Sequence, residues 1–487
     1  MKRSAVLTVA CAVLSCQPAQ VAPPPCPSVS PTLSTATAAP VASTAPPPDP
    51  RASLPKNWVD AADKIAAASK ARTNAYTWLS TLTDSFGHRL SGSKALEGAI
   101  DFAVESMKKA GLSNARREKV MVPHWVRGKE SARVVTPIER EIAMLGLGGS
   151  VGTGNKPIKG EVIVFDTLDD LKNSKDPLKN KVVLVNQPMP PFDPKTNETG
   201  YGTTATIRWW AASEAGKKGA VAALIRSVTA KNFRMPHTGS MAPYEKDGPK
   251  IPAAAIAPED ADYIARASKK GAVTIELSMG AKTFPDAESA NAVAELAGSS
   301  LPNEVVVVGG HIDSWDVGDG ANDDGAGCAM ALDAVTLLKE LQLVPKRTLR
   351  VVLFTNEENG LRGGKGYFEA HGKEVHIGAI ESDFGAGAPR GFQVHGPAPF
   401  VAAVKSWTPL FQEWGAVDIQ EGHTGADISP LEKAGVPCVG LVPDGSHYFD
   451  LHHSHADTID KIDPGNLRKN AAALALMAYL LAEGAVL

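Results

Sequence analysis

The sequence is poor in cysteine, in runs of basic residues and in long apolar runs. Three of its five cysteines lie within the first 26 residues, so Cys328 and Cys438 alone cannot form a disulfide framework. A net charge of -3 without any long basic run argues against a nucleic-acid partner. The apolar run at residues 5–14 is too short to span a membrane as a mature helix.

Residues 1–16 are predicted to be a lipoprotein-type signal peptide. Basic Lys2 and Arg3 precede the apolar run, and Val13-Leu14-Ser15-Cys16 resembles a bacterial lipoprotein signal that is cut before Cys16. Lipid on that thiol would make the protein an exported lipoprotein at the cell envelope, in the periplasm or on the outer membrane. The membrane contact would be made only through the anchor on Cys16. The alternative is an ordinary secretory signal and a secreted protein.

A segment without glycine and with very few large apolar side chains follows the signal. Between Gln17 and Pro50 it consists mostly of Pro, Ala, Ser and Thr, with Asp49 as its single charged residue. Such a composition cannot bury a core. Its prolines favour extended polyproline II, so residues 17–56 are predicted to form a disordered, semi-rigid tether.

Four apolar runs in the second half of the chain each lead into His, Asp or Glu residues. The runs are Glu304–Gly310, Leu349–Thr355, His376–Ile380 and Val436–Val442. Each is typical of a buried parallel strand. Open α/β sheets bind ligands outside the carboxyl ends of their strands. Because all four runs deliver such side chains there, we expect a site at that edge of the sheet.

Imidazole and carboxylate ligands without thiolates suit zinc, manganese or cobalt. Two histidines and three or four carboxylates exceed what one tetrahedral zinc needs. They fit two ions roughly 3.5–4 Å apart that share one carboxylate, an arrangement that activates water and polarises a carbonyl. The adjacent pair Glu357-Glu358 offers one carboxylate for metal and one that is free to act as a base.

These motifs resemble the two-zinc exopeptidases, and most closely the carboxypeptidase Q (plasma glutamate carboxypeptidase) group with its bacterial aminopeptidase relatives. The resemblance begins near Trp58, and its motifs occur in the family's order. The motifs are His311-Ile-Asp-Ser-Trp-Asp-Val-Gly318, Asn322-Asp-Asp-Gly-Ala-Gly327, Asn356-Glu-Glu-Asn-Gly360, Glu381-Ser-Asp-Phe-Gly385 and His452-His-Ser-His-Ala-Asp-Thr458.

The resemblance implies a role for each motif residue. It implies two zinc ions, one bound by His311 and Asp383, the other by Glu358 and His453, with Asp323 bridging both. It implies Glu357 as the general base and a cis peptide bond between Asp323 and Asp324. Asp313 would orient the imidazole of His311.

Two further candidates stay open. The position before the ligand His453 holds a tyrosine in many family aminopeptidases, where its hydroxyl helps to hold the oxyanion. Here it is His452, which is either a donor to the oxyanion or a packing neighbour, and Tyr448 is a weaker candidate for that donor. Asp427 could hold the amino terminus of the substrate or cap the helix that begins near Ser429.

The predicted fold is α/β, with a mixed, mostly parallel sheet flanked by helices. Residues 57–138 and 285–487 are expected to form the catalytic domain. Short strands between residues 139 and 284 resemble the protease-associated domain that is often inserted in these enzymes, and this domain would frame the cleft. Its His237 is interpreted as a loop residue and not as a ligand.

The sequence thus predicts a zinc-dependent exopeptidase for short peptides, an aminopeptidase in the first place. A dipeptidase or carboxypeptidase Q-like activity is the alternative, and a glutaminyl cyclase-like acyltransferase is a more remote one. A non-catalytic binding module is disfavoured because no ligand position and no base is missing. A homodimer is a further expectation.

Overall fold

The computed structural model describes residues 49–484. The predicted signal peptide and the tether up to residue 48 lie outside this range. The predicted end of the tether needs correction, because helix α1 (Lys56–Ser69) begins before residue 57 and is preceded by folded chain. The Arg51 guanidinium donates to Asp63 at 2.6 Å, and Leu54 packs against the core. No helix within the described range is long and apolar enough to cross a membrane.

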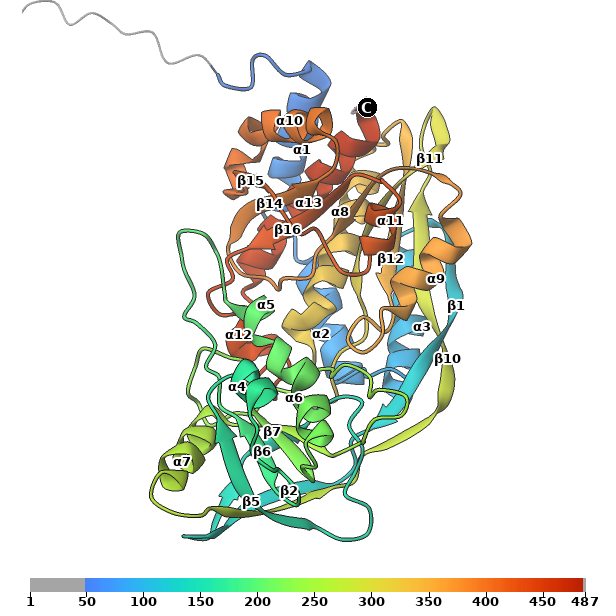
Figure 1. Cartoon of the computed structure of the whole chain (residues 1–487). Coiled ribbons are helices and arrows are strands. Elements are labelled where there is room, and N and C mark those ends of the chain that lie inside the picture. The colour runs from blue at the N-terminus through green and yellow to red at the C-terminus, as the bar shows by residue number, and fades with distance from the viewer. Residues whose placement is uncertain (1–48, 485–487) are drawn as a thin grey trace, which may run out of the picture. The chain divides into compact units, whose positions relative to one another are not determined.

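The first of two sheets carries the predicted strand ends (Figure 1). Its strand order is β1-β10-β12-β11-β13-β16-β14-β15. The central strands β12, β11, β13 and β16 are parallel neighbours. The pairs β1–β10, β10–β12 and β14–β16 are antiparallel, and β14–β15 is parallel. The strands are β1 (Ser113–Val126), β10 (Lys282–Leu296), β11 (Leu301–His311), β12 (Arg347–Phe354), β13 (Val375–Glu381), β14 (Pro389–His395), β15 (Asp418–Glu421) and β16 (Cys438–Pro443).

The central strands are buried on both faces, as their continuous apolar runs predict. In β11, Val306 and Val308 pack into one apolar cluster, and Val305 and Val307 into another on the opposite face. The first cluster is covered by α1, α2 (Asn74–Phe86), α3 (Lys94–Lys109), α8 (Ala326–Glu340), α10 (Ala398–Ser406), the 3-10 helix η2 (Thr408–Trp414) and α13 (Pro464–Glu483). The second is covered by α9 (Arg362–His371) and α11 (Ser429–Lys433).

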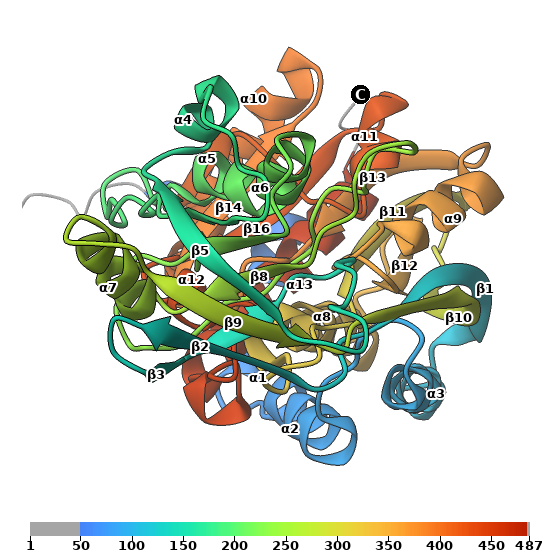
Figure 2. The same cartoon turned by 60° about the horizontal axis from the view of Figure 1, so that its bottom comes forward.

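The inserted segment forms the second sheet, in the order β3-β2-β9-β5-β6-β7-β8-β4 (Figure 2). It starts at Glu130, before the predicted boundary at residue 139, because β2 pairs antiparallel with β9. Its strands are β2 (Glu130–Thr136), β3 (Arg140–Ile142), β4 (Met144–Gly146), β5 (Ile158–Phe165), β6 (Val182–Val185), β7 (Ala222–Arg226), β8 (Ala253–Ile256) and β9 (Thr274–Met279). Its helices are α4 (Leu168–Asn173), α5 (Tyr201–Thr204), α6 (Thr206–Lys217) and α7 (Pro258–Ser268).

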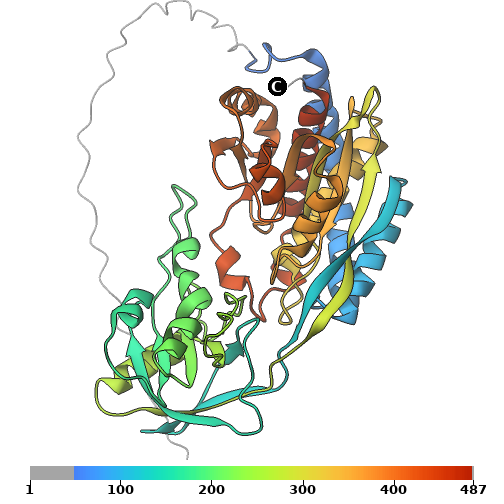
Figure 3. The same cartoon turned by 45° about the vertical axis from the view of Figure 1, so that its right-hand side comes forward.

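A long two-stranded ribbon connects the sheets. β1 and β10 pair from Ser113↔Glu295 in the first sheet to Val126↔Lys282 beside the second, and Figure 3 shows this ribbon running between the two parts. The chain thus leaves and re-enters the first sheet on adjacent strands. The predicted mixed α/β fold is confirmed, with the inserted residues forming a mixed α/β layer of their own.

Candidate metal centre

The four predicted strand ends meet at one edge of the first sheet. Because β12, β11, β13 and β16 are adjacent and parallel, their carboxyl ends lie side by side. Asp323 lies in the kinked segment η1 (Ala321–Gly325), which precedes α8 and is not helical at Asp323 and Asp324. His453 follows the short helix α12 (Tyr448–Leu451). Sequence segments more than 100 residues apart therefore converge on one buried cluster.

The five predicted ligands lie together, with their donor atoms facing each other. The Nε2 atom of His311 lies 3.3 Å from Asp383 Oδ1 and 3.4 Å from Asp323 Oδ1. The Nε2 atom of His453 lies 3.2 Å from Asp323 Oδ2 and 2.9 Å from Glu358 Oε2. The two oxygens of the Asp323 carboxylate thus face two different imidazoles.

Backbone carbonyls fix the orientation of both imidazoles. His311 Nδ1 lies 3.0 Å from the Asp313 carbonyl oxygen, and His453 Nδ1 lies 3.3 Å from the Thr238 carbonyl oxygen. Because a carbonyl can only accept, each Nδ1 carries the proton. Each Nε2 then faces the carboxylates, and in the neutral imidazole its lone pair can bind a metal ion.

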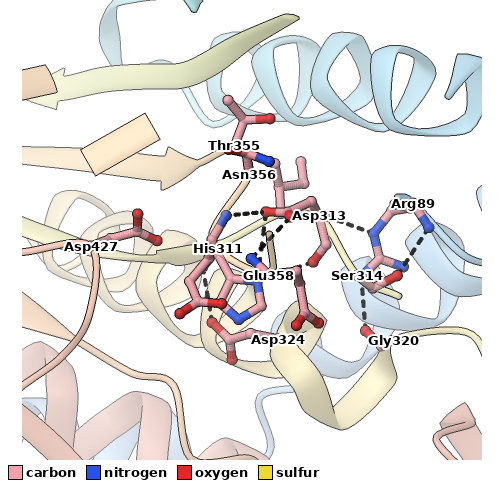
Figure 4. Close-up of polar contacts among 12 residues, drawn as sticks. Arg89, His311, Asp313, Ser314, Gly320, Asp324, Thr355, Asn356, Glu358 and Asp427 are labelled. Atoms are coloured by element: carbon pink, nitrogen blue, oxygen red, sulfur yellow. Dashed lines mark hydrogen bonds and ion pairs between the residues drawn. The ribbon is translucent and has the colours of Figure 1, made fainter. Parts of the chain in front are cut away.

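The role predicted for the Asp313 side chain needs correction. Its carboxylate lies 3.8 Å from His311 Nδ1, whereas the main-chain carbonyl of the same residue makes the shorter contact. The carboxylate instead accepts the backbone N–H groups of Glu357 at 3.0 Å and Glu358 at 3.4 Å (Figure 4). Asp313 therefore fixes the loop that carries both glutamates.

Hydrogen bonds from neighbouring carboxylates hold the segment around Asp323. The peptide bond between Asp323 and Asp324 is cis, which confirms the prediction. Asp457 accepts the N–H groups of Asn322 at 2.7 Å and Asp323 at 3.1 Å, while Asp324 accepts the N–H of His311 at 3.0 Å. Asp457 lies in the motif that carries His453, and nothing in that motif indicated this contact.

Buried carboxylates and imidazoles in the cluster shift one another's pKa values. Burial and neighbouring carboxylates raise the pKa of Glu357 well above its usual value and that of Glu358 to about 7. The pKa of His453 rises to about 9, because Glu358 and Asp323 outweigh the effect of burial. Two buried carboxylate oxygens, Asp323 Oδ2 and Glu358 Oε1, have no hydrogen-bond partner within the described range. Unpartnered buried carboxylates among imidazoles fit a site for divalent metal ions.

His452 lies directly beside the cluster of predicted ligands. Its Nε2 is 3.7 Å from Asp323 Oδ2, and its ring stacks on His453 with 3.4 Å between ring centroids. Burial and the neighbouring His453 hold the pKa of His452 well below its usual value, so its imidazole is neutral. A neutral imidazole at this place can donate a hydrogen bond to a bound ligand.

The inserted segment contributes contacts that the sequence did not reveal. The Arg208 guanidinium lies 3.4 Å from His453 Nδ1, the Tyr201 ring packs edge-on against His452, and the His237 imidazole donates to the His452 carbonyl at 2.7 Å. His237 is thus a buried loop residue that holds backbone, in line with its interpretation from the sequence. No motif surrounds Arg208 or Tyr201, so their proximity follows only from the fold.

Asp427 does not cap the helix that begins near Ser429. Helix α11 has Ile428 at its N-cap position and no side-chain cap, so the capping alternative is wrong. Asp427 is buried, and its Oδ1 accepts the N–H of Gly364 at 3.2 Å. Its Oδ2 has no hydrogen-bond partner among the described residues.

A fully buried arginine holds the loop between β11 and η1. The Arg89 guanidinium donates to the carbonyl oxygens of Gly87, Ile312, Asp319 and Gly320 at 2.6–2.9 Å. Figure 4 labels Arg89 and Gly320. Burial lowers its pKa, and nearby carboxylates oppose that effect. The arginine lies in the loop between α2 and α3, for which the sequence predicted no role.

Replacing Arg89 with methionine should destabilise the protein by about 3–5 kcal/mol, because several buried carbonyl groups would lose their donor. Urea unfolding measures this change in the free energy of unfolding. Arg234→Met is the matched control: this arginine also donates to a carbonyl, that of Glu141, but its side chain is 50% exposed. Equal losses in the two variants would show that Arg89 has no special structural role.

A cavity of about 700 Å³ adjoins the cluster. Asp383 and Glu381 line it, and the inserted segment contributes Tyr201 to its wall. Its volume is in the range of pockets that enclose small ligands. The cluster therefore borders a space that can hold a substrate.

Comparison with known proteins gives a consistent assignment. The sequence model of Peptidase family M28 matches residues 291–478. Carboxypeptidase Q from Mus musculus is 41% identical over 433 residues, which covers 88% of this chain and 90% of that protein. A crystal structure of a peptidase M28 precursor from Shewanella amazonensis is 36% identical, with a TM-score of 0.84, and covers 88% of this chain and 97% of that one.

A more distant structure shares the fold. The zinc aminopeptidase from Bacillus subtilis has a TM-score of 0.63 at 19% identity, over 84% of this chain and 95% of that one. The identity and coverage shared with carboxypeptidase Q, together with the matching family model, show the family. The chain therefore belongs to peptidase family M28, a family of metallo-exopeptidases.

Proposed function

We propose that this protein is a two-zinc exopeptidase that removes the amino-terminal residue from short peptides. The observation that carries the proposal is the arrangement of Asp323 between His311 and His453, with one carboxylate oxygen facing each imidazole. Two ligands that each lie about 2.0–2.1 Å from a tetrahedral zinc are about 3.3 Å apart. The four distances in the cluster, from 2.9 to 3.4 Å, fit this value.

Two ions would share the cluster. His311 and Asp383 would hold one zinc ion, Glu358 and His453 the other, and Asp323 would bind both. Asp323 Oδ2 and Glu358 Oε1, which lack hydrogen-bond partners among the described residues, support this assignment. Bound zinc would supply a Lewis acid for the peptide carbonyl and would lower the pKa of water.

Glu357 would act as the general base. Its carboxylate would accept a proton from the attacking water and deliver that proton to the leaving amine. Burial and the neighbouring carboxylates of Asp383 and Glu358 raise the pKa of Glu357, which favours uptake of a proton. The backbone bond to Asp313 keeps the main chain of Glu357 in place while the side chain carries the proton.

Three residues would hold the substrate. The neutral imidazole of His452 would donate to the developing oxyanion. Tyr448 is a second, weaker candidate for this donor. It is buried, and its ring centroid lies 5.3 Å from that of His452. The free Oδ2 of Asp427 would bind the substrate ammonium group, which would favour peptides with an unblocked amino terminus.

Dipeptidase activity of the carboxypeptidase Q kind is the second candidate, favoured by the 41% identity to carboxypeptidase Q.

The purified protein should hydrolyse free dipeptides and tripeptides and contain two zinc ions per chain. An amino-blocked peptide should be resistant, and a carboxyl-blocked peptide should be cleaved. Cleavage of the amino-blocked peptide would contradict the aminopeptidase assignment, and resistance of the carboxyl-blocked one would favour the dipeptidase. Metal analysis of the same sample tests the zinc content.

We further propose that the second sheet is a protease-associated domain that frames the cleft, since it contributes Tyr201 to the cavity wall. Residues 57–138 and 285–487 would form the catalytic domain, except that strand β2 (Glu130–Thr136) belongs to the second sheet. The lipid on Cys16, the location at the cell envelope and the homodimer stay predictions. Fatty-acid labelling of a Cys16→Ser variant and measurement of the molecular mass in solution would test them.

A further inference from the structure

A loop of the inserted segment folds over the first sheet. This roof loop (residues 191–200) precedes α5 and reverses on itself, with the Asp193 N–H donating to the Glu198 carbonyl at 2.8 Å. The Asn197 N–H donates back to the Asp193 carbonyl at 2.9 Å. The loop therefore has a defined turn of its own and presents side-chain and carbonyl groups towards the catalytic domain.

One side of the roof loop is fastened by an arginine of β14. The Arg390 guanidinium donates to the carbonyl oxygens of Pro194 at 3.0 Å and Lys195 at 2.9 Å. Its Nε donates to Asp418 of the neighbouring strand β15 at 3.3 Å, which fixes the plane of the guanidinium. The arginine thus ties the inserted segment to two strands of the first sheet.

The other side is fastened by the amide of Asn197. Its Nδ2 donates to the Pro443 carbonyl at 3.2 Å, and its Oδ1 accepts the Gly445 N–H at 3.1 Å. Pro443 ends β16, the strand that leads towards His453. The Asn197 amide therefore bonds one carbonyl and one N–H group of the main chain at the end of β16, as a neighbouring strand would.

The cavity beside the metal centre lies between these two attachments. Asn197 and Tyr201 line it from the inserted segment, Gln393 and Asp418 line it from the sheet, and Asp383 lies at the metal end. Arg390 also lines it. The fastened roof loop is therefore a wall of the space that adjoins the site, and its position limits the room there.

We propose that Arg390 and Asn197 determine the length of the substrate by holding the roof loop down over the cavity. This inference rests on the proposed function. A peptide whose first residue is at the metal centre extends its carboxyl end away from it, by about 3.3–3.6 Å for each added residue. The fastened loop limits the room beyond the cleaved bond and obstructs longer chains. Free dipeptides and tripeptides are then the preferred class of substrate.

The test compares Leu-Gly with Leu-Gly-Gly-Gly, both with free ends, in the full protein with its metal. The variants are Arg390→Ala, Asn197→Ala, their combination, and Arg390→Lys, which keeps the charge and one point of attachment. In the double variant, kcat/KM for the tetrapeptide relative to the dipeptide should rise about tenfold, because the wall that excludes the longer chain is released. Arg390→Lys should lie between wild type and Arg390→Ala.

A second measurement follows the loop itself, without using catalysis. Trypsin should cut after Lys195 faster in the double variant than in wild type, because the carbonyl of Lys195 loses its donor. Arg234→Ala is the matched control: it removes an arginine that bonds a carbonyl within the inserted segment, outside the cavity wall. It should change neither the substrate ratio nor the cut at Lys195.

The outcomes separate this inference from the proposed function. An unchanged substrate ratio in the double variant, with wild-type zinc content, overturns the inference whether or not the cut at Lys195 becomes faster, and leaves the exopeptidase proposal standing. A wild-type protein that cleaves no peptide overturns the proposed function and the inference together. A raised ratio together with a faster cut at Lys195 supports both.

Discussion

Replacing Glu357 with glutamine is expected to lower kcat for dipeptide hydrolysis by about 10²–10⁴-fold, the contribution of a positioned general base, while the zinc content stays at the wild-type level. The amide has the shape of the carboxylate but cannot accept the proton of the attacking water. The backbone N–H of residue 357 still donates to Asp313, so the loop should keep its position. Steady-state kinetics and metal analysis on one sample measure both effects.

Glu357→Asp is the matched control for this prediction. It keeps the carboxylate but withdraws it by one methylene group, so its kcat should lie between those of wild type and Glu357→Gln. Hydrolysis at the wild-type rate by Glu357→Gln would remove the residue from the mechanism. Loss of zinc in that variant would instead make Glu357 a part of the metal site.

Replacing Asp323 with alanine should empty both metal positions. Each of its carboxylate oxygens lies within 3.4 Å of a different histidine Nε2, so the change would remove one ligand atom from each of the two proposed sites. Loss of a residue that only hydrogen-bonds a metal ligand lowers metal affinity about 10–100-fold. Loss of a ligand that both ions share should lower the affinity at both positions by more than this. Dialysis against a zinc buffer followed by metal analysis should then give less than one zinc ion per chain, with no measurable activity.

Asp319→Ala is a suitable comparison for Asp323→Ala, because it removes a carboxylate from the same loop without touching the cluster. It should retain two zinc ions. Two tightly held zinc ions in Asp323→Ala would contradict the bridging role. One retained ion would assign Asp323 to a single position.

The sequence predicted the parts of the site that follow directly from strands. Apolar runs such as the one that ends at His311 become buried parallel strands, and a ligand that directly follows a strand has its position fixed by the sheet. Glu358 and Asp383 were predictable for the same reason. Their motifs also carry the resemblance to the family, so two independent arguments converge on them.

The remainder depends on contacts between distant parts of the chain. Thr238 and Arg208 reach His453 across 215 and 245 residues of sequence, and no local pattern reports such a contact. The sequence also cannot tell which group of a residue makes a bond. At Asp313 the main-chain oxygen and the carboxylate both act, but on different partners. The start of the second sheet was misplaced because β2 finds its partner only at β9.

The bond from His453 to the Thr238 carbonyl has a consequence for assembly of the enzyme. The imidazole comes from the carboxyl-terminal third of the chain and its acceptor from the inserted segment, so the correct tautomer arises only after these two regions have docked. A shortened protein without β2 to β9 could keep every metal ligand and still bind its second ion poorly. Zinc loading would then report on completion of docking, and a chelator should capture ions more easily from freshly refolded chains than from mature ones.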